Sequence, residues 1–268
     1  MEKLDGIANT LFVPLYGRIY VSKKFPEYFY DKMALKIEAK FTASISKGSF
    51  EYTNMAYAAR YYNMDKMVIK FIKKHKTCNI VSLGIGLETA YDRLTQKCGL
   101  GKINYYGIDF PEVIEIRKKY FGERKQETLI AGDMFEMEWK NQIDTSIPTL
   151  LIVSGVFQYF FEDKIIEFIK NLKKEFPYGE LIFDTTRKNG LKFTNWFIKR
   201  TGNPEALMHF YIEDGIEFSK KTDTILAEEL TFFKDARKLL RKKINFITKL
   251  FMKIADCRRQ ALIIHLKW

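Results

Sequence analysis

Five short apolar runs alternate with longer helical patterns between residues 79 and 186, and this alternation constrains the fold more than any other feature. The runs are rich in β-branched residues and apolar at successive positions, as is typical of strands buried on both faces of a parallel sheet. They are NIVSLG (79–84), INYYGID (103–109), TLIAGD (128–133), TLLIVSG (149–155) and ELIFDTT (180–186). Strands that alternate with helices in this way predict a doubly wound, mostly parallel α/β sheet.

Helical patterns lie between these runs and also before the first of them. PEVIEIRKKYF begins with Pro111, a residue favoured in the first turn of a helix. EDKIIEFIKNLKKEF and NMDKMVIKFIKKH both place apolar residues at helical spacing. The alternation breaks after residue 186, and ALIIHLKW (261–268) has the pattern of a final strand.

A single domain is expected for a chain of 268 residues without repeats or linkers. We divide it into an N-terminal helical cap, a sheet core, a late cap that is helical or irregular, and the final strand. These segments span residues 1–60, 61–186, 187–255 and 256–268. The two caps are expected to cover the carboxyl ends of the strands, where open α/β sheets bind ligands.

Composition excludes several classes of protein. No apolar run approaches the roughly 18 residues of a membrane span. The start, MEKLDGIANT, lacks the apolar stretch of a signal peptide, so we expect a cytoplasmic protein. Cys78, Cys98 and Cys257 are too few and too widely separated for a disulfide framework or a metal cluster, and no metal is expected.

The net charge of +12 is concentrated late in the chain, in KDARKLLRKKINFITKLFMK. Apolar residues recur there at the spacing of one helix, at Ala236, Leu240, Ile244, Ile247, Phe251 and Ile254. The segment predicts either an amphipathic helix docked on the body with a solvated basic face, or a surface for an anionic partner. Earlier in the chain, Arg18 and Lys23 are interpreted as solvated surface charges, or as charges that attract an acidic substrate.

The first apolar run ends in a glycine turn, VSLGIGLETA. Gly84 and Gly86 allow backbone N–H groups to approach a ligand at the start of the next helix. Asp109 ends the second run, where a carboxylate commonly accepts hydrogen bonds from ribose hydroxyls. Together they indicate a ligand that contains adenosine. The alternative is a plain tight turn, with Asp109 capping the helix that begins near Pro111.

Two further positions favour S-adenosylmethionine over a dinucleotide. Asp133 ends the third run, where an adenine amino group can donate to it. Thr89 replaces the third glycine of the G-x-G-x-x-G pattern, and a methionine moiety needs no pyrophosphate cradle.

Six segments occur in the order found in a known family. They are TLFVPLYGRIYVSKKFPEYFYDKMA (10–34), YAARYYNMD (57–65), VSLGIGLETAYDRL (81–94), YYGIDFPEVIE (105–115), SGVFQYF (154–160) and GELIFDTT (179–186). In these segments the chain resembles the leucine carboxyl methyltransferase family and its bacterial relatives, the tetracenomycin-type polyketide O-methyltransferases. The resemblance covers about residues 8–186. It implies the seven-stranded, Rossmann-like sheet of class I S-adenosylmethionine-dependent methyltransferases.

The resemblance also assigns roles to residues. It implies that Arg60 pairs with the carboxylate of the cofactor, whereas the residues alone suggest an ordinary surface ion pair. It places Gly84 in the cofactor loop and Asp109 at the ribose. It further implies that Asp133 and Met134 lie along the adenine edge.

Two residues near the end of the fourth run receive less definite roles. Ser154 stands where the family usually has Glu near the cofactor, which puts cofactor affinity and activity in question. Tyr159 matches a family tyrosine, although core packing explains an aromatic there equally well.

The expected activity is methyl transfer to a carboxylate or hydroxyl oxygen of a small, polyketide-like acceptor. A carboxylate needs no general base, whereas a hydroxyl benefits from one. His209 and Tyr159 are the weak candidates for such a catalytic group. The alternatives are a catalytically impaired or regulatory relative, an RNA methyltransferase suggested by the charge, and an NAD-dependent oxidoreductase. Nucleic acid is the less expected partner, because no RNA-binding module is evident.

Overall fold

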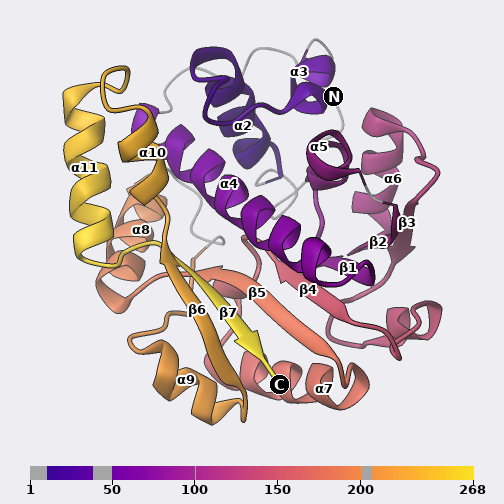
Figure 1. Ribbon diagram of the computed structural model, residues 1–268. Coiled ribbons are helices and arrows are strands. Elements are labelled where there is room, and N and C mark those ends of the chain that lie inside the picture. Colours follow the sequence, from indigo (N-terminus) through magenta and orange to yellow (C-terminus); the bar gives the residue numbers. More distant parts are fainter. Residues whose placement is uncertain (1–10, 39–49, 100, 201–206) are drawn as a thin grey trace.

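A seven-stranded sheet forms the centre of the computed structural model, which describes residues 11–38, 50–99, 101–200 and 207–268 (Figure 1). The strand order is β3-β2-β1-β4-β5-β7-β6. Neighbouring strands run parallel except at β7, which is antiparallel to both β5 and β6. The strands are β1 (Thr77–Leu83), β2 (Lys102–Asp109), β3 (Glu127–Ala131), β4 (Thr149–Val153), β5 (Gly179–Thr185), β6 (Ile225–Thr231) and β7 (Leu262–Lys267). The predicted doubly wound, mostly parallel sheet of seven strands is confirmed.

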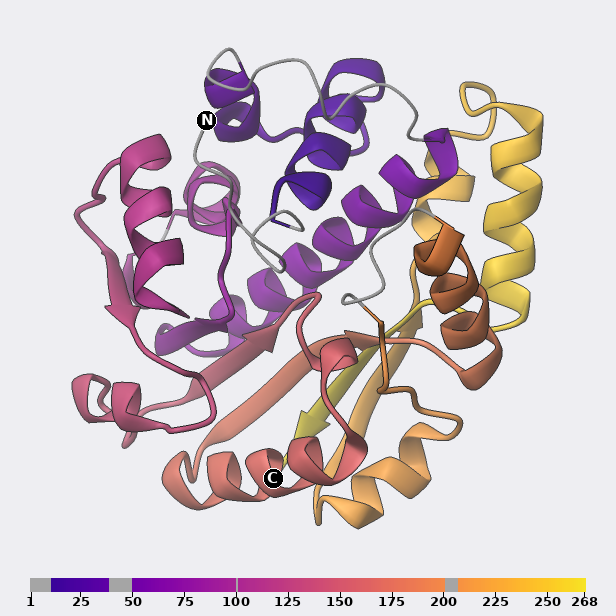
Figure 2. The ribbon, with the colours of Figure 1, turned by 180° about the vertical axis from the view of Figure 1, so that it is seen from behind.

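Helices cover both faces of the sheet (Figures 1 and 2). On one face lie α4 (Glu51–Lys74), α5 (Ala90–Cys98) and α6 (Pro111–Phe121), which share a buried apolar cluster with β1 and β2. On the other face, α7 (Glu162–Glu175) and α9 (Gly215–Lys221) pack against β4 and β5 in a second cluster. The predicted helices at 111–121 and 162–176 are present, and Pro111 occupies the first turn of α6.

Seven further helices lie in the described part of the chain. They are α2 (Phe12–Lys24), α3 (Lys32–Ile37), η2 (Glu138–Gln142), η3 (Phe157–Tyr159), α8 (Lys188–Arg200), α10 (Lys234–Leu239) and α11 (Phe246–Cys257). Helix α2 packs along α4 above the sheet (Figure 1). Within the described ranges, every helix is too short or too polar to cross a membrane.

The expectation that residues 187–255 are helical or irregular is wrong for β6. This edge strand pairs only with β7, and its ladder is interrupted between Leu226 and Glu228. Its side chains are half-exposed or exposed rather than buried. A strand that buries neither face carries a weak hydrophobic pattern, which explains why the sequence did not reveal it.

The single late helix predicted from 236 to 254 is two helices in the structure. Ala236, Leu240 and Ile244 are buried as predicted, whereas Ile247 is 61% and Phe251 51% exposed. Between the two groups, the Asn245 side chain accepts a hydrogen bond from the Ile247 N–H and caps α11. The cap begins a new helix in a new orientation, so the periodicity of the first helix does not continue into the second.

A buried cluster of charged side chains joins three helices to the glycine turn. The Arg93 guanidinium of α5 binds Asp65 of α4 through two N–H groups, with N–O distances of 2.9 Å. Its remaining terminal nitrogen lies 2.7 Å from a Glu88 oxygen and 3.2 Å from Asp31 Oδ2. Arg18 of α2 binds the same Asp31 oxygen at 3.0 Å. Each of these five side chains is less than 10% exposed.

This cluster overturns the interpretation of Arg18 as a solvated surface charge. Arg18 is 1% exposed, and it donates to the Leu87 carbonyl at 2.5 Å as well as binding Asp31. Lys23, in contrast, is exposed and pairs with Glu38, as a surface charge should. The spacing of α2 residues alone did not reveal which of its charges face the protein.

Removing the Arg93 guanidinium should destabilise the fold strongly, since three buried carboxylates would lose their shared cation. For Arg93→Met we expect the free energy of unfolding to fall by about 3–5 kcal/mol in urea titrations. Lys97→Met is the matched control, because Lys97 also pairs with Asp65 but its side chain is 41% exposed. It should lose less than about 1 kcal/mol. Equal losses in the two variants would contradict the central role of Arg93.

Glu88 should make stability depend on pH. Burial alone would raise the pKa of its carboxyl, but Arg93 and Arg18 outweigh this and lower it from 4.5 to about 2. Because the pKa is lower in the folded state, the ionised form stabilises the fold above about pH 4.5. This stabilisation, on the order of 3 kcal/mol, is lost as the pH falls from 4.5 towards 2.

The check is to measure unfolding free energies of the wild type and Glu88→Gln between pH 7 and pH 2.5. The difference in unfolding free energy between the wild type and Glu88→Gln should become smaller as the pH falls. Glu167→Gln, on the exposed surface of α7, should show no such gap. A gap that stays constant across this range would refute the assignment.

Candidate active site

The turn after β1 requires glycine at two positions. Gly84 has φ +66° and Gly86 has φ +49°, in the left-handed region that other residues avoid. A Cβ on Gly84 would lie 2.6 Å from Val156 Cγ2, so the turn also has no space for a side chain there. The turn thus brings its backbone close to the segment that follows β4.

Asp109 closes the other side of this turn. It lies at the end of β2, and its Oδ2 accepts the Gly86 N–H at 2.7 Å. Its Oδ1 accepts the N–H of Phe110 at 2.9 Å. Burial raises the pKa of Asp109 from its ordinary value, although these two backbone hydrogen bonds oppose the shift. Since a carboxylate can accept about four hydrogen bonds, two sites on Asp109 remain for a ligand.

Arg60 reaches from α4 to the carboxyl ends of β4 and β5. It is 6% exposed, and its Nη1 lies 3.1 Å from Asp184 Oδ2. Asp184 also accepts the Gly155 N–H at 2.6 Å. A Cβ on Gly155 would lie 2.7 Å from Arg60 Nη1, so the guanidinium rests directly on this glycine. The expectation of a surface ion pair, drawn from the residues alone, is therefore wrong.

One nitrogen of the Arg60 guanidinium has no hydrogen-bond partner among the described residues. Tyr61 Oη accepts a hydrogen bond from Nη2 at 3.1 Å, but the buried Nε–H has no partner among the described residues. A buried N–H without an acceptor is unfavourable. Arg60 is thus a fixed cation with the capacity to bind an anionic group.

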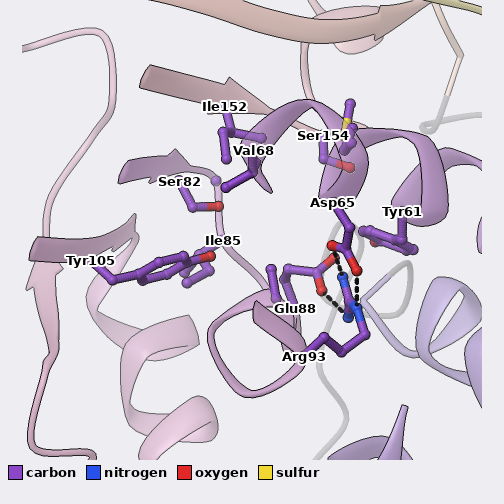
Figure 3. Close-up of a pocket in the computed structure, with 13 residues that line it drawn as sticks. Tyr61, Asp65, Val68, Ser82, Ile85, Glu88, Arg93, Tyr105, Ile152 and Ser154 are labelled. Atoms are coloured by element: carbon purple, nitrogen blue, oxygen red, sulfur yellow. Dashed lines mark hydrogen bonds and ion pairs between the residues drawn. The ribbon is translucent and has the colours of Figure 1, made fainter. Parts of the chain in front are cut away.

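Ser154 lies beside a small cavity between α4, the glycine turn and the end of β4 (Figure 3). The cavity measures about 30 Å³, enough for a water-sized group. Figure 3 shows Asp65 and Glu88 pointing toward Arg93 on one side of it. The buried Ser154 Oγ has no hydrogen-bond partner among the described residues, and neither has Glu88 Oε2.

The two residues predicted to lie along the adenine edge, Asp133 and Met134, have different environments. Asp133 follows β3, is half-buried, and accepts the Phe135 N–H at 2.9 Å. Met134 is 7% exposed and belongs to the apolar cluster that contains Trp139. Asp133 is thus placed at the carboxyl edge of the sheet with Asp109, whereas the Met134 side chain lies in the core.

His209 lies at the surface beside η3. Its N–H donates to the Gln158 carbonyl at 2.7 Å, and its exposed ring lies 4.4 Å from that of Phe161. It is not among the residues that line the cavity at Ser154. The structure thus does not bring His209 together with the glycine turn.

Tyr159 lies closer to the Arg60 cluster. It is half-buried, and it is one of the groups that raise the pKa of Tyr57, whose ring lies 5.7 Å from the Arg60 guanidinium. Burial raises the pKa of Tyr57 to about 12, although Arg60 opposes the shift. The Tyr57 phenol therefore stays protonated near neutral pH and can donate a hydrogen bond.

Sequence reasoning assigned no role to Asp184 or Arg93, although the motifs GELIFDTT and GLETAYDRL contain them. Asp184 orients Arg60, and Arg93 anchors the turn that carries Glu88. For Asp184 the available signal was a charged residue at the end of an apolar run, whereas Arg93 lies inside a helix, where a charge is ordinary. Among the residues described, no group of His, Cys, Asp and Glu side chains is arranged to hold a metal ion.

Known proteins share parts of this sequence. Residues 8–173 match the family model for leucine carboxyl methyltransferases. The chain is 21% identical over 203 residues to the tetracenomycin polyketide synthesis O-methyltransferase of Streptomyces glaucescens, and the match covers 75% of this chain and 74% of the relative. It is 28% identical over 150 residues to leucine carboxyl methyltransferase 1 of Debaryomyces hansenii, covering 41% of this chain and 40% of that one.

Solved structures share the fold at low identity. A DUF574 family protein from Streptomyces avermitilis superposes with a TM-score of 0.57 and 10% identity, over 94% of this chain and 96% of its own. An S-adenosylmethionine-dependent methyltransferase from Clostridium acetobutylicum gives 0.50 and 12%, over 77% and 91%. The family model, which spans well over half of the sequence, confirms the resemblance drawn from the motifs. The chain is an S-adenosylmethionine-dependent methyltransferase and belongs to the leucine carboxyl methyltransferase family.

Proposed function

We propose that this chain transfers the methyl group of S-adenosylmethionine to a carboxylate or hydroxyl oxygen of a small-molecule acceptor. The observation that carries the proposal is the buried Arg60 guanidinium, which retains an unpartnered N–H at the carboxyl edge of the sheet. The relatives of this chain include an enzyme named as a polyketide O-methyltransferase and one named as a carboxyl methyltransferase. Both names denote methyl transfer to oxygen.

The residues of the site fit the cofactor. Arg60 supplies a fixed cation for its carboxylate, since guanidinium and carboxylate pair through parallel hydrogen bonds. The two unused acceptor sites of Asp109 suit ribose hydroxyls. The Ser154 hydroxyl, buried without a partner, can bond a polar group of the methionyl part. Asp133 remains the proposed acceptor for the adenine amino group.

S-adenosylmethionine supplies an electrophilic methyl group when bound, so the protein mainly aligns the acceptor and excludes water. Arg60 is held in one position by Asp184 and Tyr61, and from this position it would orient the carboxylate of the cofactor. A carboxylate acceptor is ionised near neutral pH and needs no base. For a hydroxyl acceptor, Tyr159 remains the candidate proton acceptor, because His209 lies at the surface away from the glycine turn.

Asp109→Asn should weaken binding of S-adenosylhomocysteine about tenfold or more in calorimetric titrations. The amide has a single oxygen for the two backbone N–H groups of Gly86 and Phe110, and it loses the charge that strengthens hydrogen bonds from the ribose. Asp163→Asn, an exposed change on α7, should bind as the wild type does. Equal affinity in the wild type and Asp109→Asn would remove Asp109 from the site.

The activity itself is tested by mass spectrometry on a panel of aromatic carboxylic acids and phenols. Transfer adds the mass of one methylene to the acceptor. A wild-type protein that binds S-adenosylhomocysteine but methylates no member of the panel would contradict the proposal. That result would instead favour a relative that keeps the cofactor without using it, as the replacement of Glu by Ser154 suggests.

Ser154→Ala distinguishes a ligand-binding hydroxyl from a packing residue. Because Ser154 Oγ has no partner among the described residues, its removal should change the free energy of unfolding by less than about 1 kcal/mol. Affinity for S-adenosylhomocysteine should nevertheless fall about 3–10-fold, the usual loss of one neutral hydrogen bond. Unchanged affinity would show that Ser154 makes no contact with the cofactor.

A further inference from the structure

Helix α11 presents a second apolar face to solvent. Thr248, Met252 and Ala255 face the body and are buried. Large apolar side chains on another side of the helix are exposed, at Phe246 (77%), Ile247 (61%), Leu250 (47%) and Phe251 (51%). Figures 1 and 2 show α11 at the periphery of the molecule, outside α8 and α10. Phe251 is partly covered by Tyr52 of α4, whose ring centroid lies 5.9 Å away, and all four side chains remain at least 47% exposed.

Two further large apolar side chains, in the segments that precede α11 and α4, are also exposed. Leu239, at the end of α10, is 56% exposed. Phe50 is 71% exposed and precedes Glu51, which accepts the N–H of Asn245 just before α11. A contiguous group of large exposed apolar residues on a monomer marks a site of interaction.

The same segment holds most of the excess positive charge. Residues 234–258 contain nine Lys and Arg but two Asp, a net charge of +7 out of +12 for the chain. Both aspartates are already paired, Asp235 with Lys66 and Asp256 with Arg237. Arg241, Lys242 and Lys253 are exposed and form no ion pair within the described part of the chain. The apolar face is therefore bordered by unneutralised positive charge.

From this combination we infer that α11 binds to the surface of an anionic lipid bilayer. Phe and Leu side chains on one face of a helix enter the boundary between headgroups and acyl chains, while Lys and Arg bind anionic headgroups. A second copy of the chain fits this face poorly, because a symmetric contact would bring two segments of charge +7 together. Nucleic acid would pair with the charges but would leave Ile247 and Leu250 without an apolar partner.

The test is co-sedimentation of the full chain with vesicles of phosphatidylcholine alone and with vesicles that contain phosphatidylglycerol in addition. We expect binding to the anionic vesicles that weakens with added salt, and little binding to the neutral ones. The double variant Phe246→Ser, Ile247→Ser should lower the partition coefficient about tenfold or more. Ile216→Ser with Ile225→Ser is the matched control, since these residues are 58% and 67% exposed on α9 and β6, and it should bind as the wild type does.

A charge variant, Lys242→Gln with Lys253→Gln, gives an independent reading, because it leaves the apolar face intact. It should also bind the anionic vesicles about tenfold more weakly. Retained circular dichroism and S-adenosylhomocysteine affinity in each variant would show that the fold is unchanged. The inference is overturned by absent binding, by equal binding to neutral and anionic vesicles, or by an equal loss in the control. A self-association that Phe246→Ser abolishes while vesicles fail to bind would overturn it as well.

Discussion

The buried ion cluster around Arg93 is the interaction on which the rest of the structure depends. It is the point where α2, α4, α5 and the glycine turn meet, and it replaces apolar packing there with charge pairing. Burying charges is unfavourable unless each one is paired and hydrogen-bonded. Arg93 satisfies this condition by binding three carboxylates at once. The arrangement fixes the position of Glu88, and through it the turn that carries Gly84 and Gly86.

The candidate active site, at the carboxyl edge of the sheet, is also held together by a buried arginine that pairs with a buried carboxylate. Arg60, Gly155 and Asp184 come from α4, from the turn after β4 and from the end of β5, and they meet in one hydrogen-bonded group. Parallel strands deliver their carboxyl ends to one edge, so residues far apart in sequence converge there. The anchored N-terminal helices lie over this edge. A rigid framework of this kind suits a reaction in which alignment matters more than acid–base chemistry.

The sequence predicted the structure correctly wherever the local backbone or local burial requires a particular type of residue. Left-handed backbone demands glycine at Gly84 and Gly86, and six of the seven strands were recognisable as short runs with a mainly apolar centre. It was misleading where burial was incomplete. The edge strand β6 has little hydrophobic pattern, and Asn245 resets the helical register before α11. Periodicity assumes one uninterrupted helix with one buried face, and α11 has apolar residues on two sides.

The sequence by itself determined the sheet, the glycine turn, the position of Asp109 at its edge and the family. These features follow from short-range patterns, in which each residue reports on its own backbone and its own burial. Only the tertiary structure decided that Arg18 and Arg60 are buried, that Asp184 holds Arg60, and that α11 turns an apolar face to solvent. A charged side chain is equally compatible with water and with a buried partner. Whether the side chain is solvated or buried depends on which distant segments the fold places beside it. A local sequence pattern contains no information about those segments.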